Sequence, residues 1–329
     1  PFLIACVYFS FNTWVLGLSS TIPLLLNTEE NYLIKDNVLS EVIPTSYTLG
    51  STLNISMMIL LVIGAPLFML LVLPKRKGKE LQELLDTSNT SKEQTIKQEA
   101  NDLKLPFNSL SDRLNNSILL QYTIVAMGLF FIVLHFSKNG LDLNLNIMIF
   151  IFLMVGLLLH KTPMRYVISM KRASSNVSGV LFQYPFYAGI MGIMKSSGLG
   201  YKLALIIASV ATIETYPFFA YLTGGIVNFA IPSAGGEFAV VGPSIINAVK
   251  EIGAGLPASE VNAMIARASL SVAYGESLSN MLQPFFLLLV MPIMALGTKL
   301  KARDIMGYLA IPVIVFFIVQ VLMILFIPL

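Results

Sequence analysis

Long runs without a charged residue are the feature that most constrains how this chain can fold. Besides the uncharged N-terminal residues 1–28, five such runs cover residues 54–73, 115–134, 173–194, 277–298 and 305–329. Each run supplies the ~20 apolar residues that a helix needs to cross a hydrocarbon layer ~30 Å thick. A further run, 143–159, is shorter. Because a bilayer accepts only helices or closed barrels, and these runs do not alternate between polar and apolar residues, they predict transmembrane helices.

The overall composition supports this prediction. Of the 329 residues, 56% are hydrophobic and only 12% are charged, whereas soluble domains carry about 25% charged residues. Too little polar sequence remains to cover the outside of a soluble core of this size. The single cysteine, Cys6, excludes a disulfide framework and a cysteine-based metal site. We therefore expect an all-α, polytopic membrane protein.

Basic residues gather in three loops, at 75–79, 161–172 and 299–303. The positive-inside rule places all three in the cytoplasm. Residues 74–116 form the one long hydrophilic region, which we interpret as a cytoplasmic linker loop between two halves of the protein. Residues 1–73 would then be the C-terminal part of a first repeat, and residues 117–329 a second repeat. The basic residues at 75–79 are interpreted as a topology determinant, and no nucleic-acid partner is expected.

Three stretches at membrane depth are crowded with small, polar and helix-breaking residues: 183–189, 228–237 (closed by Gly242-Pro243) and 274–284. Proline removes a backbone donor and glycine weakens a helix. In lipid the freed backbone groups need partners, so such breaks persist only inside protein or along a cavity. We therefore expect a re-entrant hairpin near 220–250 and a broken helix near 262–296.

The stretch 17–23 weakly resembles 277–284, and each precedes one uninterrupted apolar span. Corresponding broken segments in two halves are typical of inverted-repeat transporters, whose half-helix ends hold the substrate. The residues expected to bind a small carboxylate are Ser19, Ser20, Thr21, Gln183, Ser233, Gly235, Gly236, Ser277, Ser279 and Asn280. A Na⁺ site near Ser279 and Asn280 is left open. We expect no other metal, and no cofactor beyond H⁺ or Na⁺ as coupling ion.

Charged residues inside apolar sequence are the sharper signal, since each costs ~2.5–3.5 kcal/mol or more at the bilayer centre. Glu237 and Glu276 lie within the predicted breaks. With Asn228 they are the expected ion-coupling residues, and the alternatives for the two carboxylates are a structural ion pair with Arg267 or a position at the membrane interface. For Glu214 the sequence favours neither the coupling role nor the structural role. No nucleophile beside a histidine base and no phosphate-binding loop is found, so an enzyme is not expected.

Four segments resemble one known family. Residues 181–194, 225–243, 275–285 and 301–308 are similar to segments of the bacterial short-chain fatty acid transporters, an acetoacetate and butyrate uptake family of the ion transporter superfamily. The chain departs from the family pattern with Ala234 for Gly, Phe238 for Trp, Glu276 for Asp and Ser279 for Thr. The resemblance covers nearly the whole chain except residues 75–115.

The resemblance implies an N-terminally truncated sequence and an inverted-repeat transporter in the bacterial inner membrane. It implies secondary active transport of short-chain monocarboxylates, coupled to H⁺ or Na⁺, by a protein that forms a homodimer in the lipid bilayer. The alternative within transporters is a C4-dicarboxylate or amino-acid carrier of the same superfamily. A channel or a membrane-embedded enzyme is the alternative outside that class.

Overall fold

The computed structural model describes residues 1–74, 94–104, 109–199, 202, 206, 209–295 and 298–329. This described part of the chain is helical and contains no strand element. It divides into two compact units, which are considered separately below. The first unit combines Pro1–Asp86 with Gln183–Leu329, and the second is Thr87–Phe182.

Within the described residues, three helical segments are long and apolar enough to cross a membrane: Phe2–Leu26, Thr52–Leu71 and Ile118–Asn139. A fourth candidate is the pair Leu145–His160 and Pro163–Ser175, which is bent by 119° at the break between its helices. The apolar helix Ala310–Phe326 is shorter. Thr52–Leu71, Ile118–Asn139, Leu145–His160 and Ala310–Phe326 match the apolar runs 54–73, 115–134, 143–159 and 305–329. The runs 173–194 and 277–298 are not among these segments. The apolar helices and the absence of a strand element in the described residues confirm an all-α polytopic membrane protein.

The N-terminal part of the first unit consists of short helices. The segment Phe2–Leu26 is itself interrupted, because a 3₁₀ helix and an extended link at 17–20 separate its two α-helices. The helices in chain order are α1 (Phe2–Ser10), η1 (Phe11–Leu16), α2 (Thr21–Leu26), α3 (Tyr32–Lys35), η2 (Thr45–Tyr47), α4 (Thr52–Ile59), the π-helical turn η3 (Leu60–Gly64) and α5 (Ala65–Leu71).

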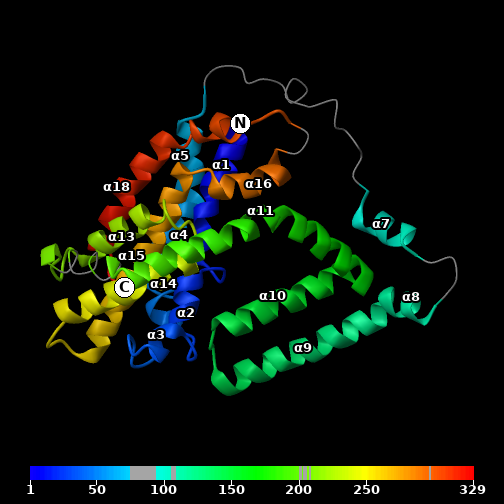
Figure 1. Ribbon diagram of the computed structural model, residues 1–329, viewed down its shortest axis with the longest axis horizontal. Coiled ribbons are helices and arrows are strands. Elements are labelled where there is room, and N and C mark those ends of the chain that lie inside the picture. The colour runs from blue at the N-terminus through cyan, green and yellow to red at the C-terminus, as the bar shows by residue number, and fades with distance from the viewer. Residues whose placement is uncertain (75–93, 105–108, 200–201, 203–205, 207–208, 296–297) are drawn as a thin grey trace. The chain divides into compact units, whose positions relative to one another are not determined.

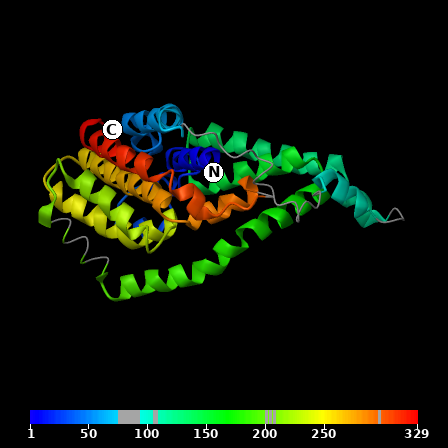
Figure 2. The same cartoon turned by 90° about the horizontal axis from the view of Figure 1, so that it is seen from above.

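The C-terminal part of the first unit is organised around one central helix, α15. The helices are α13 (Tyr216–Val227), α14 (Ala234–Ile252), α15 (Ala258–Ser279), η4 (Asn280–Leu282), α16 (Phe285–Met294), α17 (Ala302–Met306) and α18 (Ala310–Phe326). Helix α15 packs against α13, α14 and α18, and also against η1 and α2 from the N-terminal part. Helices α13, α15 and α18 are labelled in Figure 1, and Figure 2 shows α15 (orange) lying between α13 (yellow-green) and α18 (red). Its residues from Met264 to Ser279 are buried, apart from the half-buried Arg267.

Glycines allow α13 and α15 to approach closely. A Cβ atom added to Gly275 would lie 2.0 Å from the carbonyl oxygen of Tyr221, and one added to Gly224 would lie 2.3 Å from that of Val272. Small residues at helix interfaces let backbones approach in this way in membrane proteins. The two helices are therefore held at a separation that larger side chains would not permit.

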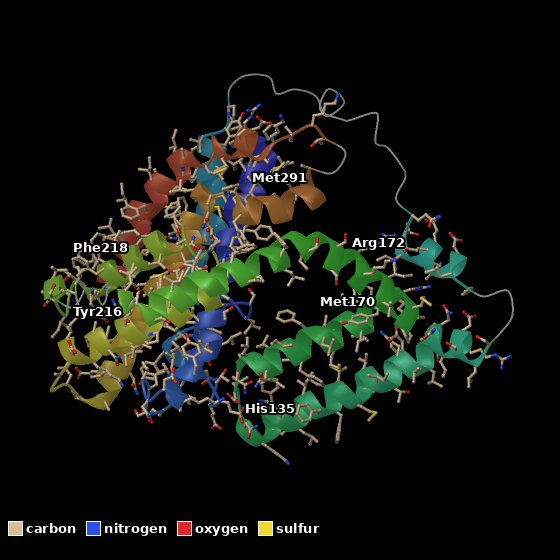
Figure 3. The ribbon with its side chains drawn as sticks, viewed as in Figure 1. His135, Met170, Arg172, Tyr216, Phe218 and Met291 are labelled. Carbon is tan, nitrogen blue, oxygen red and sulfur yellow. The ribbon has the colours of Figure 1, made fainter. Side chains whose placement is uncertain are left out.

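The second unit contains α7 (Ile96–Asp102), α8 (Leu110–Asn115), α9 (Ile118–Asn139), α10 (Leu145–His160) and the start of α11 (Pro163–Ser196). Helices α9 and α10 form an antiparallel hairpin (Figure 1), joined where the side chain of Gln121 donates to the Leu157 carbonyl at 2.8 Å. Arg172 on α11 reaches α7, where it forms an ion pair with Glu99 (Figure 3).

The predicted helix breaks have three different outcomes. The break at 228–237 is confirmed, since α13 ends at Val227 and α14 begins at Ala234. In the 274–284 stretch the helix continues to Ser279, and the interruption follows at η4 and residues 283–284. The predicted break at 183–189 is wrong, because α11 runs through it with Pro185 inside the helix. A proline costs one helical hydrogen bond, and membrane helices accept this loss where neighbouring groups compensate for it.

The sequence echo has a structural counterpart. In both places a 3₁₀ helix (η1 or η4) follows an α-helix, and a short non-helical link then leads into the next α-helix. The division of the chain into two repeats stays a prediction.

Candidate functional site

Several helix ends meet around the C-terminal end of α15. Helices α2, α13 and α14 and the 3₁₀ helix η1 all contact α15. At this level α13 ends, α14 begins and α15 gives way to η4. Interrupted helices leave backbone N–H and C=O groups without intrahelical partners. The polar side chains described below gather where those groups become free.

Asn228, the C-cap residue of α13, forms hydrogen bonds that connect the break after α13 with the break after α15. Its side-chain nitrogen Nδ2 lies 2.7 Å from Ser279 Oγ, 2.8 Å from Asn280 Oδ1 and 3.1 Å from the Glu276 carbonyl oxygen. The Glu276 carbonyl can only accept a hydrogen bond, so the amide must present its donor to it. Gln283 closes the network by donating to Asn280 Oδ1 at 3.0 Å and to the Asn228 carbonyl at 3.2 Å.

The N-terminal helices contact the same network. Tyr8 on α1 donates its hydroxyl to the carbonyl oxygen of Asn280 at 3.1 Å. Ser277 donates to the side-chain oxygen of Asn12 on η1 at 2.8 Å. These pairs join residues more than 260 positions apart in the chain. The interruption at η1 and the interruption after α15 are thus hydrogen-bonded to each other.

Glu237 and Glu276 are both completely buried, at 0% exposure. None of their four carboxyl oxygens has a hydrogen-bond partner among the described residues. They come from the neighbouring helices α14 and α15, and the two carboxyl groups interact electrostatically. Burying a carboxylate without a partner is costly, so such a group holds a proton or a cation. This pair is the strongest indication of ion chemistry in the described structure.

Arg267 forms no ion pair with Glu237 or Glu276 among the described side chains, so the ion-pair alternative predicted from the sequence is wrong. The guanidinium of Arg267 instead donates to the carbonyl of Ile324 at 3.0 Å. Ile324 lies in the last turn of α18, whose final carbonyls have no intrahelical partner. Arg267 therefore satisfies the end of α18 and compensates its negative dipole end.

The N-terminus of α14 faces α2. Ser233 is the N-cap residue but forms no capping hydrogen bond through its side chain. A Cβ atom added to Gly235 would meet the methyl group of Thr21 at 3.4 Å, so the first turns of α2 and α14 are in contact. Ser20, which precedes α2, is buried, and its hydroxyl has no partner among the described residues.

Among the described residues of this region, the unpaired buried polar atoms divide into two chemical kinds. The side-chain N–H donors are Asn12 Nδ2 and Asn280 Nδ2, and the Ser20 hydroxyl can also donate. The acceptors are the carboxyl oxygens of Glu237 and Glu276 and the Asn228 oxygen Oδ1. Donors suit an anion such as a carboxylate, and hard oxygen acceptors suit a proton or a small cation. We call Asn12, Ser20, Asn228, Glu237, Glu276 and Asn280 the polar cluster.

The structure brings most of the predicted site residues to this region. Ser277, Ser279 and Asn280 take part in its hydrogen bonds, Thr21 contacts Gly235, and Ser233 and Gly236 lie at the start of α14. Ser19 does not join them, since it is exposed and its hydroxyl bonds to the Trp14 carbonyl. The side chain of Gln183 lies outside the described part of the chain.

Glu214, which the sequence left open, lies in an exposed turn before α13. The Thr212 hydroxyl donates to its carboxylate at 2.7 Å, and this hydrogen bond lowers the pKa of Glu214. A solvated carboxylate of this kind carries no sign of a buried coupling role.

Three residues of the region were not selected from the sequence: Tyr8, Asn12 and Gln283. Gln283 could have been found, because it lies in the predicted break beside Pro284. Tyr8 and Asn12 are single polar residues within an apolar segment, and no local pattern distinguishes them from interfacial residues.

Comparison with known proteins identifies the family. The model of the family "Short chain fatty acid transporter" matches residues 1–327. The chain is 34% identical over 309 residues to a protein of Escherichia coli strain K12, and 33% identical over 311 residues to one of Haemophilus influenzae. Both relatives are named "Putative short-chain fatty acid transporter".

The first match covers 94% of this chain and the second 93%, and the chain spans 65% of the length of each relative. No solved structure matches the chain. The family is one of transporters, as the sequence predicted, and not of enzymes. The chain belongs to the short chain fatty acid transporter family.

Proposed function

We propose that the protein is a secondary active transporter that carries short-chain monocarboxylates, such as short-chain fatty acids or acetoacetate, together with H⁺ or Na⁺. Family membership supports the transport of such acids. The observation that carries the proposal is the polar cluster, which combines unpaired buried donors with unpaired buried acceptors. A site that must hold an anion and a cation at the same time needs both.

The anion would be held at the helix ends. Two side-chain amide donors, from Asn12 and Asn280, have no partner within the described chain. The first turn of α14 adds backbone N–H groups that no side chain caps, at the positive end of the helix dipole. A single carboxylate uses a few such donors, which fits a monocarboxylate substrate.

The cation would be held by Glu237 and Glu276, and Asn228, whose side chain is bonded to the Glu276 carbonyl, offers a further unpaired oxygen. A substrate carboxylate entering this region meets two acidic side chains, so its binding is opposed unless those groups are neutralised. Uptake of a proton or Na⁺ by the pair removes that opposition. Because coupling is reciprocal, the cation and the anion then favour each other's binding, which is what co-transport requires.

The helix breaks supply the architecture for alternating access. Substrate sites of secondary transporters lie at discontinuous helices near the bilayer midplane, where one repeat moves against the other. The hydrogen bonds that Ser277 donates to Asn12 and that Tyr8 donates to Asn280 link the two interruptions. We further propose that the protein lies in the bacterial inner membrane as a homodimer, with residues 74–116 in the cytoplasm. The basic residues at 75–79 support that orientation.

Uptake of radiolabelled butyrate into proteoliposomes that contain the full-length protein tests this proposal. The pH gradient and the Na⁺ gradient are imposed separately, and protein-free liposomes serve as the control for passive entry of the undissociated acid. We expect saturable uptake that one of the two gradients drives. If no monocarboxylate shows saturable uptake under either gradient, the proposal is wrong.

A further inference from the structure

An apolar cavity of about 170 Å³ lies beside the polar cluster. It is bounded by α13, by the end of α15 with η4, and by α18. Aliphatic and aromatic side chains form most of its wall, among them Leu222, Leu278, Val313 and Phe317. Gly225 and Gly275 also line it, and a Cβ atom added to Gly225 would meet only backbone atoms of Gly275 within 4 Å.

The cavity is connected to the polar cluster through one lining residue, Ser279, which is hydrogen-bonded to two members of the cluster. Two of the lining residues carry hydroxyl groups, and that of Tyr221 is bonded to Gln320 at 2.8 Å. The other is Ser279, whose Oγ is bonded both to the Asn228 side chain and to the Glu276 carbonyl. The cavity therefore has an apolar body and a single contact with the cluster that would hold a carboxylate.

The volume indicates how large an occupant can be. An apolar protein cavity of about 150 Å³ is sufficient to hold benzene. A cavity of 170 Å³ therefore accepts an aliphatic chain of about four to six carbons. The cavity is open on one side, where the lining residues Ile226, Phe229 and Leu282 are exposed. Its contact with Ser279, which is bonded to residues of the polar cluster, favours a short free acid as the occupant, because the carboxylate and the chain of one molecule are then both bound.

We propose that this cavity binds the aliphatic chain of the transported acid and thereby sets which chain lengths the protein accepts. The inference rests on the proposed function, since it assumes that the carboxylate is held at the polar cluster. Each additional methylene group that enters the cavity is expected to raise the affinity about fourfold, equivalent to ~0.8 kcal/mol. The gain should stop when the cavity is full, and longer acids should then bind more weakly.

Two substitutions change the cavity in opposite directions. In Gly225→Ala the new methyl group meets the Gly275 carbonyl oxygen at 3.5 Å, an ordinary contact, so the cavity shrinks while the helices stay in place. In Val313→Ala two methyl groups are removed from the wall and the cavity grows. Gly192→Ala is the matched control, because a Cβ atom there meets nothing within 4 Å and Gly192 does not line the cavity.

The test is competition of labelled butyrate uptake by unlabelled straight-chain acids of two to eight carbons. We expect the optimum to move to shorter acids in Gly225→Ala, with at least about a fourfold loss for the longest acid accepted. It should move to longer acids in Val313→Ala and stay unchanged in Gly192→Ala. Intact butyrate uptake with the same chain-length profile in both cavity variants would overturn this inference and leave the proposed function standing.

Binding is also measured without transport, by the thermal stabilisation that the same acids give to the purified protein in detergent. If labelled butyrate is not transported at all, a chain-length optimum of stabilisation that moves in the two variants still supports the cavity, and one that does not move overturns it. Native mass spectrometry supplies the lipid control. A lipid retained by the unaltered protein and lost in Gly225→Ala, with an unchanged chain-length profile, would contradict the inference.

Discussion

The contact between α13 and α15 gives the sharpest prediction on stability. In Gly275→Ala the new Cβ atom would lie 2.0 Å from the Tyr221 carbonyl oxygen and 3.0 Å from the Gly225 amide nitrogen. Both neighbours are backbone atoms and cannot rotate away. Ordinary contact begins near 3.4 Å, so the two helices must separate by about 1.4 Å.

The cost of that separation follows from the interface. A gap of 0.5–1 Å already removes a quarter to a half of the dispersion attraction between contacting atoms, and overpacked cores typically lose ~1–3 kcal/mol. The separation would also stretch the bonds from Asn228 to Ser279 and Asn280, now 2.7 and 2.8 Å, beyond hydrogen-bonding distance. We expect a loss near 3 kcal/mol, which lowers the melting temperature by roughly 6–12 °C, together with loss of uptake.

The assay measures the melting temperature of the purified protein in detergent. Samples are heated, and the monodisperse peak that remains is measured by size-exclusion chromatography. Gly225→Ala is the control on the same interface, because its nearest contact is 3.5 Å. It should leave the melting temperature unchanged or raise it slightly, since alanine favours a helix over glycine by ~1 kcal/mol. Equal melting temperatures for Gly275→Ala and Gly225→Ala would refute the close packing of α13 on α15.

Three further predictions concern single side chains. Asn228→Ala removes three buried hydrogen-bond contacts, so we expect a loss of ~2–4 kcal/mol in detergent melting and no measurable uptake. Arg267→Met should lower the free energy of unfolding by only ~1 kcal/mol, because one hydrogen bond to the Ile324 carbonyl is lost, and should retain butyrate uptake. A loss of substrate affinity in this variant would show that Arg267 binds the anion. Ser20→Ala should raise the KM for uptake severalfold, whereas Ser19→Ala should leave it unchanged. Of these two serines, only Ser20 is buried with an unpaired hydroxyl. Equal effects of the two substitutions on KM would contradict the assignment of Ser20 to the site.

The helices and their main interruption could be predicted from the sequence because both depend on local properties. Uncharged runs of about twenty residues predict spans, and the helix-breaking stretch 228–237, which contains Pro232, includes the interruption between the end of α13 and the start of α14. Pro185 shows the limit of this reasoning. A proline signals a break, but the surroundings decide whether a helix bends, stops or continues through it.

The site could be predicted only in part. Glu237 and Glu276 were identifiable because a carboxylate in apolar sequence is rare and costly. Their surroundings were not identifiable, since Asn12 and Tyr8 reach the end of α15 across more than 260 residues of sequence. The role of Arg267 depends equally on where α18 ends in space. Such pairings are fixed by tertiary packing, which leaves no periodic signal in a single sequence.

We propose that the buried carboxyl pair, Glu237 and Glu276, couples a cation to the movement of a carboxylate. The most direct test compares two modes of butyrate transport in proteoliposomes that contain the Glu276→Gln variant of the full-length protein. We predict that exchange of labelled for unlabelled butyrate without a gradient persists, because the donors for the anion remain. Accumulation driven by a pH or Na⁺ gradient should be lost, because the amide cannot take up the coupling cation. If gradient-driven accumulation in Glu276→Gln equals that of the unaltered protein, Glu276 is not the coupling group and the account is contradicted.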